Sequence, residues 1–320
     1  MKKIIAVLLV AALVFALSAC GNLRKIKSVI SEITDGEVLD GDGMIKDDSD
    51  WREEDSSRKE SSKPEPKREY TISNEVLADN EHITVTVVEA YESDFGDFVL
   101  KILVENKSDI NISINNDTGD VSYNGYMIYS WWSSEVSAGK KANSEMIIYS
   151  EDIKMSGLGV AEEVAFKLAA YTEDSYDSRA DEYFSVYPTG LDADSVTYPD
   201  RAPVAGETVI VDNEDLKFTI ERVNHDESWA YELQFYVENK TDDAMYITWN
   251  DQSINGFMVS SYWNKTVFSG MKSVSIARFF NEELEKNDIT DVEEIEFELK
   301  AYKGNYNGDV IFEDTFVYYP

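Results

Sequence analysis

The sequence contains two copies of one pattern, and this internal repeat restricts the possible folds more than any other feature of the chain. The tetrapeptide Val-Glu-Asn-Lys occurs at residues 104–107 and again at 237–240. Four further pairs of segments match in the same order: residues 79–87 with 212–220, 123–132 with 254–263, 138–141 with 269–272, and 162–171 with 293–302. Five ordered matches indicate one module of about 110 residues that is present twice.

Each copy has the alternating pattern of β-strands. Near the end of the second copy, Ile295, Phe297 and Leu299 alternate with charged side chains, which gives one buried and one solvated face. Other apolar runs in both copies alternate in the same way, and turn signals separate them. About seven strands per copy predict an all-β fold of two tandem antiparallel immunoglobulin-like β-sandwich domains, although the Cys-Trp-Cys core of antibody domains is absent.

Asparagine residues mark the expected turns. Asn106 and Asn239 each end a strand, and we expect them to adopt the left-handed conformation of a tight turn. The Asn-Gly pairs at 124–125 and 255–256 are a second turn signal, typical of two-residue hairpins. Each copy is also expected to hold one short helix, with Ser150 or Asn281 as its N-cap.

The N-terminus has the features of a targeting segment. Lys2 and Lys3 precede an unbroken apolar run of fourteen residues, Ile4 to Leu17, which is short for a membrane span and suits a secretory leader. Leu17 to Gly21 resembles the lipobox of bacterial lipoproteins, in which the cysteine receives a diacylglyceryl group. Cys20 is the only cysteine of the chain, so we expect lipidation at Cys20 rather than a disulfide. An ordinary signal peptide is the alternative.

These features predict five parts. They are a lipoprotein signal peptide at 1–19, the lipidated Cys20 with a charged tether to residue 69, a first module at 70–188, a linker at 189–207, and a second module at 208–320. The tether is Ser-rich and carries Pro64 and Pro66, a composition that favours an extended chain. The formal net charge of −34 excludes nucleic acid as a partner and suits a solvated surface outside the cell.

Five short motifs also resemble a known type of protein. "VLADNE", "VENK", "YNG", "AGKK" and "EEVAF" occur in this order, as in secreted proteins and lipoproteins of Gram-positive, clostridia-type bacteria. The resemblance covers roughly residues 70–320 and implies tandem immunoglobulin-like sandwiches of unassigned function at the extracytoplasmic face of the cell membrane. It supplies no catalytic residues.

No sequence motif indicates catalysis. The chain has two histidines, His82 and His225, which occupy different positions of the repeat. Neither belongs to a nucleophile, metalloprotease or nucleotide-binding motif. We therefore expect a non-enzymatic protein whose modules bind or scaffold at the envelope, in contact with a wall glycan or another surface protein. The alternatives are a substrate-binding lipoprotein that feeds a transporter and, less favoured, a surface glycan hydrolase.

Two adjacent aromatic pairs are the candidate ligand contacts. Trp131 and Trp132 in the first copy align with Tyr262 and Trp263 in the second. Neighbouring residues of a strand point to opposite faces, so one member of each pair is expected outside the core. An exposed aromatic ring can stack on a sugar or anchor a protein partner.

Calcium is the one cofactor that the sequence leaves open. The tripeptide Asp-Asn-Glu recurs, and its carboxylates Asp79, Glu81, Asp212 and Glu214 are weak candidate ligands. The competing interpretation is an Asx turn between two strands. Acidic loops at residues 115–120 and 172–182 are further candidates, and a solvated surface is the competing interpretation for them.

Overall fold

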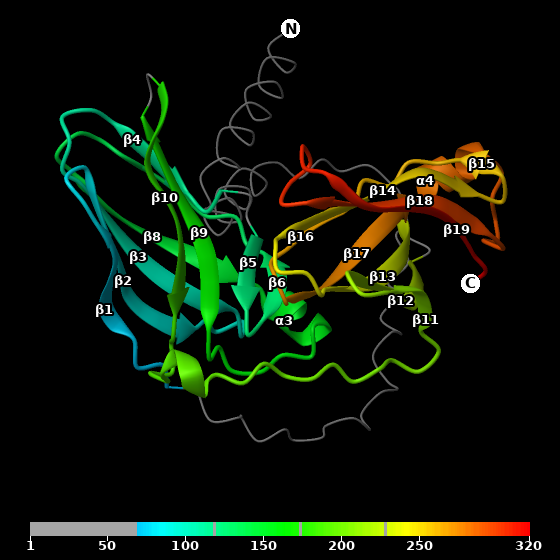
Figure 1. Ribbon diagram of the computed structural model, residues 1–320, viewed down its shortest axis with the longest axis horizontal. Helices are drawn as coiled ribbons and strands as arrows, with labels where there is room; N and C mark the ends of the chain where they lie inside the picture. Colours follow the sequence, from blue (N-terminus) through cyan, green and yellow to red (C-terminus); the bar gives the residue numbers. More distant parts are fainter. Residues whose placement is uncertain (1–68, 118–119, 173–174, 227–228) are drawn as a thin grey trace, which may run out of the picture. The chain divides into compact units, whose positions relative to one another are not determined.

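A computed structural model describes residues 69–320 apart from 118–119, 173–174 and 227–228 (Figure 1). For residues 175–182 and 226 it describes only the backbone. Cys20, the signal peptide and the predicted tether up to residue 68 lie outside the described residues. The described chain is mostly β-strand, as expected, and none of its helices is long and apolar enough to cross a membrane.

The strands follow one another in the same order in both copies, which we call the first repeat (residues 70–188) and the second repeat (208–320). The first repeat comprises β1 (Ser73–Asp79), β2 (Ile83–Glu92), β3 (Phe98–Asn106), β4 (Ile112–Asn115), β5 (Asp120–Tyr123), β6 (Tyr126–Tyr129), β7 (Ser133–Val136), β8 (Lys141–Ile148), α3 (Ser150–Met155), β9 (Val164–Thr172) and β10 (Ser175–Val186). The 3-10 helix η1 (Ala193–Ser195) follows it. The second repeat comprises β11 (Thr208–Asp212), β12 (Leu216–Asp226), β13 (Ala230–Asn239), β14 (Met245–Ile254), β15 (Phe257–Met258), β16 (Asn264–Val267), β17 (Lys272–Phe280), α4 (Asn281–Lys286), β18 (Ile295–Lys303) and β19 (Val310–Tyr318).

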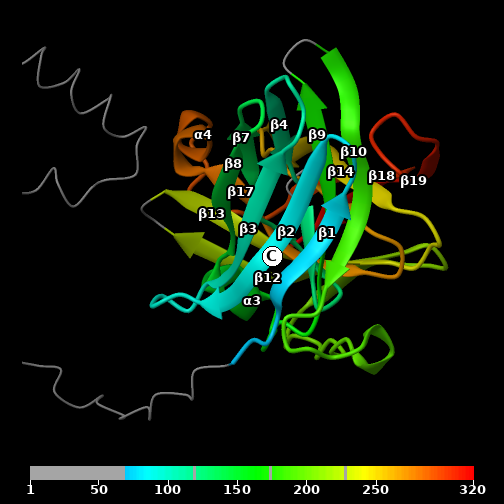
Figure 2. The same ribbon diagram turned by 90° about the vertical axis from the view of Figure 1, so that its left-hand side faces the viewer.

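Each repeat divides its strands between two antiparallel layers. In the first repeat, β1-β2-β3-β8 form one layer, whose first three strands lie side by side in Figure 2, and β7-β4-β9-β10 form the other. The second repeat has the equivalent layers β11-β12-β13-β17 and β16-β14-β18-β19. The register repeats as well, since Glu105 faces Lys141 and Glu238 faces Lys272. The sandwich-like arrangement agrees with the expected all-β class.

Two hydrophobic clusters fill the spaces between these layers. The larger cluster draws mainly on buried residues between Ile72 and Val186, and the other mainly on residues between Val211 and Ala301. In β18, Ile295, Phe297 and Leu299 are fully buried while the residues between them are not, as the alternation predicts. Burial of such side chains stabilises each by about 1.5–3 kcal/mol relative to the exposed state.

Strand β6 joins the two repeats. It pairs in parallel with β17 at Tyr126 and Lys272, and Ser273 Oγ donates to the carbonyl of Met127 at 3.1 Å. Met127 is fully buried in the cluster of the second repeat. Beside it, Lys265 Nζ forms an ion pair with Asp120 Oδ1 at 2.9 Å, and both side chains are about one-tenth exposed. The repeats therefore share backbone pairing, apolar contact and a buried ion pair.

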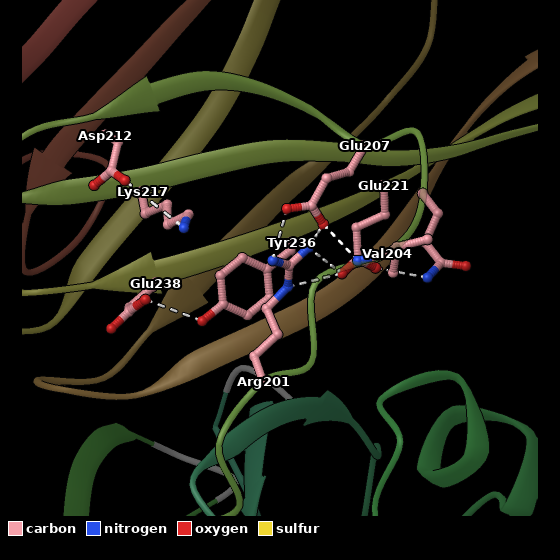
Figure 3. Close-up of polar contacts among 9 residues, drawn as sticks. Arg201, Val204, Glu207, Asp212, Lys217, Glu221, Tyr236 and Glu238 are labelled. Atoms are coloured by element: carbon pink, nitrogen blue, oxygen red, sulfur yellow. Dashed lines mark hydrogen bonds and ion pairs between the residues drawn. The ribbon is translucent and has the colours of Figure 1, made fainter.

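The chain between the repeats is held on the second repeat by Arg201 (Figure 3). Its guanidinium group binds the carboxylates of Glu207 and Glu221, the latter at 2.8 Å, and lies 4.2 Å from the ring centre of Tyr236. The side chain is only 11% exposed, so this arrangement satisfies a buried charge with two carboxylates and an aromatic face. Tyr198, three residues before Arg201, holds the same connecting chain to the first repeat, because its hydroxyl donates a hydrogen bond to the carboxylate of Glu163.

Asn106 and Asn239 end β3 and β13, as predicted, but the left-handed conformation expected of them is wrong. Neither residue has a positive φ, and both are almost completely buried. Asn106 Nδ2 donates to the carbonyls of Ile110 and Val136 at 2.7 and 2.9 Å, while its Oδ1 accepts from the Ser108 amide and hydroxyl. Asn239 makes the four equivalent bonds in the second repeat. In both repeats, therefore, the buried asparagine side chain links a turn to a neighbouring strand inside the sandwich.

The other local predictions have mixed outcomes. Asn124 and Asn255 have φ of 50° and 51° and are followed by glycines of positive φ, so the predicted hairpin turns are confirmed. Both short helices exist, but Ser150 and Asn281 are their first helical residues and not their N-caps.

The prediction of an acidic loop at 172–182 is wrong for most of its length, because Thr172 ends strand β9 and residues 175–182 belong to strand β10. Asp-Gly and Asn-Gly turn signals are absent from this stretch, and only Tyr176 among its residues is aromatic, so its composition gives no clear indication of a strand.

Candidate functional site: a tyrosine face on the second repeat

The structure separates the four aromatic residues singled out in the sequence into two buried and two exposed side chains. Trp132 and Trp263 are 2% and 5% exposed, and their indole Nε1 atoms donate to Ser144 and Ser275 at 3.0 and 3.1 Å. They belong to the cores and are not available to a ligand. Trp131 is 52% exposed and Tyr262 is 92% exposed, so one member of each pair points outward, as expected. The strand assignment behind that expectation is wrong, because residues 130–132 and 259–263 lie in connections between strands.

Three further tyrosines form a cluster on the solvent side of the β14–β18 pair. Tyr246 and Tyr302 face each other across these strands, with ring centres 6.2 Å apart. Tyr306, from the loop before β19, lies 5.9 Å from Tyr246 and 5.7 Å from Tyr302. We call Tyr246, Tyr302 and Tyr306 the tyrosine face. The alternation of β14 and β18 places these rings outside because their neighbours Met245, Ile247 and Ala301 fill the core.

The loop that carries Tyr306 is fixed by backbone contacts. Gly304 N donates to the carbonyl of Ala244 at 2.6 Å, and Gly308 N donates to that of Asn305 at 2.8 Å. A Cβ on Gly308 would lie 1.7 Å from the carbonyl oxygen of Lys303, so only glycine fits there. Tyr306 is 64% exposed and therefore presents its ring from an ordered position, which lowers the entropy cost of a contact.

Polar groups surround the rings on the same solvent face. Lys300 Nζ lies 5.8 Å from the ring centre of Tyr302 and pairs with Glu313 at 2.9 Å. Asn250 Nδ2 donates to Glu298 at 3.2 Å on the same pair of strands. The side chains alternate along each strand, so these donors and acceptors share the face with the rings.

The predicted contact residue Tyr262 lies near the tyrosine face. Burial raises the pKa of the Tyr246 hydroxyl above its usual value of 10, and the neighbouring hydroxyls of Tyr262, Tyr306 and Tyr302 raise it further. Tyr262 also lies two residues before Asn264, which pairs with Thr248 on β14, the strand that carries Tyr246. One sequence-predicted residue therefore joins three that the sequence analysis did not single out.

The calcium candidates take part in turns and lysine pairs. Asn80 Oδ1 accepts from the amides of His82 and Ile83, and Asn213 makes the equivalent bonds, so the Asp-Asn-Glu segments form Asx turns. Asp79 binds Lys107, and Asp212 Oδ1 lies 2.5 Å from Lys240.

These lysine contacts are the main reason that the pKa of each of the two aspartates is lowered from 3.8. Among residues 69–320, outside the three undescribed gaps, no group of three or more His, Cys, Asp or Glu side chains could hold a metal ion.

The comparisons with known proteins add little. No protein-family model and no curated protein matches the sequence. The exo-chitosanase CsxA of Amycolatopsis orientalis is 10% identical over 71% of this chain, with a TM-score of 0.25, and the matched region spans only 26% of that enzyme. The YadV chaperone is 12% identical, with 74% of this chain and 100% of the chaperone covered and a TM-score of 0.22. A structure of the Salmonella enterica SafA pilin with the SafB chaperone is 10% identical over 77% of this chain and 100% of that chain, with a TM-score of 0.21. Similarities this weak carry no argument.

Proposed function

We propose that this protein is a lipid-anchored, extracytoplasmic binding protein of a Gram-positive envelope, and that the tyrosine face contacts a neutral wall or surface glycan without catalysis. The single observation that carries the glycan assignment is the cluster of three tyrosine rings on a fixed, solvent-facing surface. Aromatic rings pack against the C–H faces of sugars, and their hydroxyls remain available for hydrogen bonds.

The polar surroundings of the rings support a sugar ligand. The ammonium group of Lys300 lies beside Tyr302 and pairs with the carboxylate of Glu313. The amide of Asn250 and the carboxylate of Glu298 add a donor and an acceptor four residues further along the same two strands. A sugar ring presents several hydroxyls around an apolar face, so it can satisfy both kinds of group at once. The formal net charge of −34 disfavours polyanionic polymers, and a neutral glycan is therefore the ligand class that we propose.

The proposal includes two immunoglobulin-like modules. The strand order supports it, because connections from β3 to β4 and from β7 to β8 cross between the layers, as in Greek-key sandwiches. The joint at β6 and β17 supports a fixed spacing between the modules. Such spacing would hold the tyrosine face at a set distance from the first repeat.

The membrane anchor in the proposal depends on Cys20. Two acyl chains bind a bilayer far more firmly than one, so a diacylglyceryl group would retain the protein at the membrane. Replacing Cys20 by Ala should release the protein into the medium of the producing cells, measured by fractionation and immunoblotting. Equal retention of the C20A variant in the membrane fraction would contradict the anchor.

The glycan contact is tested by binding to isolated Gram-positive cell walls and insoluble neutral polysaccharides, using the purified chain. The Tyr306→Ala variant should lose retention by about tenfold, because one stacked ring contributes on the order of 1–1.5 kcal/mol. Trp131→Ala is the matched control, since Trp131 is an exposed aromatic residue of the first repeat outside the tyrosine face.

The outcomes of this experiment separate the alternatives. Retention that falls equally for Tyr306→Ala and Trp131→Ala would assign binding to scattered aromatics and not to the tyrosine face. Retention lost only on chelation would assign it to the acidic turns and calcium. If the unmodified chain binds none of the polysaccharides, the glycan proposal is wrong.

A further inference from the structure

A cavity of about 490 Å³ opens at one end of the second repeat, beneath helix α4. Its apolar wall consists of Tyr231, Leu284, Ile289 and Val292. Leu284 and Ile289 are 5% and 9% exposed, so the wall belongs to the ordered core. The rim is polar, and one of its members is His225.

The first repeat has a cavity at the same place. Seven lining positions correspond in the aligned repeats. They are Glu92 with His225, Phe98 with Tyr231, Ser150 with Asn281, Ile153 with Leu284, Lys154 with Glu285, Leu158 with Ile289, and Gly159 with Thr290. The volume of this first cavity is about 260 Å³, which is roughly half that of the second. One repeat thus provides an internal reference for the other.

Besides Phe98, two aromatic rings line the smaller cavity, those of Tyr70 and Tyr123. Tyr70, which precedes β1, packs edge-on against Phe98 with ring centres 5.2 Å apart. Tyr123 packs edge-on against Phe98 from 5.6 Å and donates its hydroxyl to the carbonyl of Gly159 at 2.9 Å. The extended segment that carries Tyr70 is held in place because the amides of Thr71 and Ile72 both donate to the carbonyl of Pro188.

The second repeat lacks both rings. The residue that corresponds to Tyr123 is Ile254, and the position that corresponds to Tyr70 is Pro203. The chain that enters the second repeat also follows another course, because Arg201 holds it against Glu221 and Tyr236. The larger cavity therefore has the apolar wall of an aromatic-binding pocket without the side chains that line its counterpart.

We propose that the cavity beneath α4 binds a tyrosine side chain presented by an extended segment of a partner protein. Tyr70 supplies the argument, since its ring, carried by an extended segment of this chain, forms part of the wall of the equivalent cavity and packs on Phe98. The ring would pack against Tyr231, where an edge-on aromatic pair contributes about 0.5–1.5 kcal/mol beyond its area burial. Its hydroxyl would lie among the polar groups of the rim, and recognition would be independent of the tyrosine face.

The histidines allow a direct test by NMR, because the chain contains only His82 and His225. The probe is an acetylated and amidated peptide with the sequence of residues 69–73, Glu-Tyr-Thr-Ile-Ser. Titration into the full chain should shift the His225 imidazole signal saturably and leave that of His82 unchanged. The same peptide with Ser in place of Tyr should shift neither. Equal shifts of both histidines, or an equal response to the Ser peptide, would overturn the proposal.

Substitution at the rim locates the site. Thr290 is exposed, so Thr290→Trp should cover the opening without disturbing the core and weaken peptide binding at least tenfold. Gly159→Trp is the matched control at the corresponding position of the first repeat, where an added Cβ meets nothing within 4 Å, and it should leave the affinity unchanged. Ile254→Tyr, which restores the ring of Tyr123, should also weaken binding. Unchanged affinity in Thr290→Trp would refute the assignment.

Discussion

The two repeats agree in their interiors and differ on their surfaces. Asn106 and Asn239 make the same four hydrogen bonds, and Trp132 and Trp263 reach equivalent serines at 3.0 and 3.1 Å. On the solvent face of the equivalent strand pair, by contrast, Ser113 lies opposite Tyr171 where the second repeat has Tyr246 opposite Tyr302. The shared bonds specify the sandwich, and the residues that changed are those that can meet a ligand.

The repeats also differ in how the chain enters them. In the first, Tyr70 lies at the cavity next to Phe98. In the second, Arg201 and Tyr198 direct the entering chain along the boundary between the repeats. This change connects the repeats, and together with Ile254 in place of Tyr123 it leaves a larger cavity at the end of the second.

The largest expected effect is at the connection between the repeats. Arg201→Met removes the cation that two largely buried carboxylates share, so Glu207 and Glu221 are left unpaired. Breaking a buried ion pair in this way costs about 3–5 kcal/mol. Urea denaturation should show this loss, and Lys300→Met, which breaks the more exposed pair with Glu313, is the control with a loss below about 1 kcal/mol. Equal losses in both variants would contradict a stabilising role for the Arg201 contacts.

The next effect tests whether the interiors are equivalent. Asn106→Ala and Asn239→Ala each leave buried carbonyl and amide groups without their partner, which costs about 2–3 kcal/mol. Because the four bonds are the same in the two repeats, the two losses in free energy of unfolding should agree within about 0.5 kcal/mol. Unequal losses would show that the matching motif is supported differently in the two copies.

The sequence analysis predicted the class of fold well because strands leave a local signal. Alternation in β18 identified the buried residues, and Asn-Gly identified both hairpin turns. The adjacent aromatic pairs also separate into one inner and one outer residue, although they lie in the connections between strands and not in strands. Each of these predictions uses residues that are neighbours in the chain.

The features that were missed depend on contacts between distant residues. Tyr246 and Tyr302 meet only because β14 pairs with β18, and no local pattern marks either as part of a cluster. The local pattern predicts Asn106 as a strand end, but it does not indicate its bond to the carbonyl of Val136, which lies thirty positions away. Both contacts follow from the order of the strands in the sheets. Local sequence patterns do not reveal that order.

Acid should produce a smaller loss of stability, through Glu207 on the chain that enters the second repeat. The hydrogen bond from Arg201 lowers the pKa of Glu207 below 4.5, so the ionised form stabilises the fold above that pH. Stability is lost as the pH falls from 4.5 through the lowered pKa, by up to about 1.4 kcal/mol per pH unit for one group. Glu207→Gln should flatten the decline of Tm in this window, whereas Glu214→Gln, an exposed carboxylate, should not. An identical decline in both variants would remove Glu207 from the acid response.

The smallest effect concerns the tryptophan bonds. Ser144→Ala and Ser275→Ala each remove the acceptor of a buried indole N–H, and the net cost of one such bond is about 1 kcal/mol. Both serine side chains are half-buried, so removal of the hydroxyl oxygen leaves little cavity. Thermal unfolding should show equal decreases in Tm for the two variants. A decrease in one repeat alone would mean that the indole finds another acceptor in the other, and that the interiors have begun to diverge as the surfaces have.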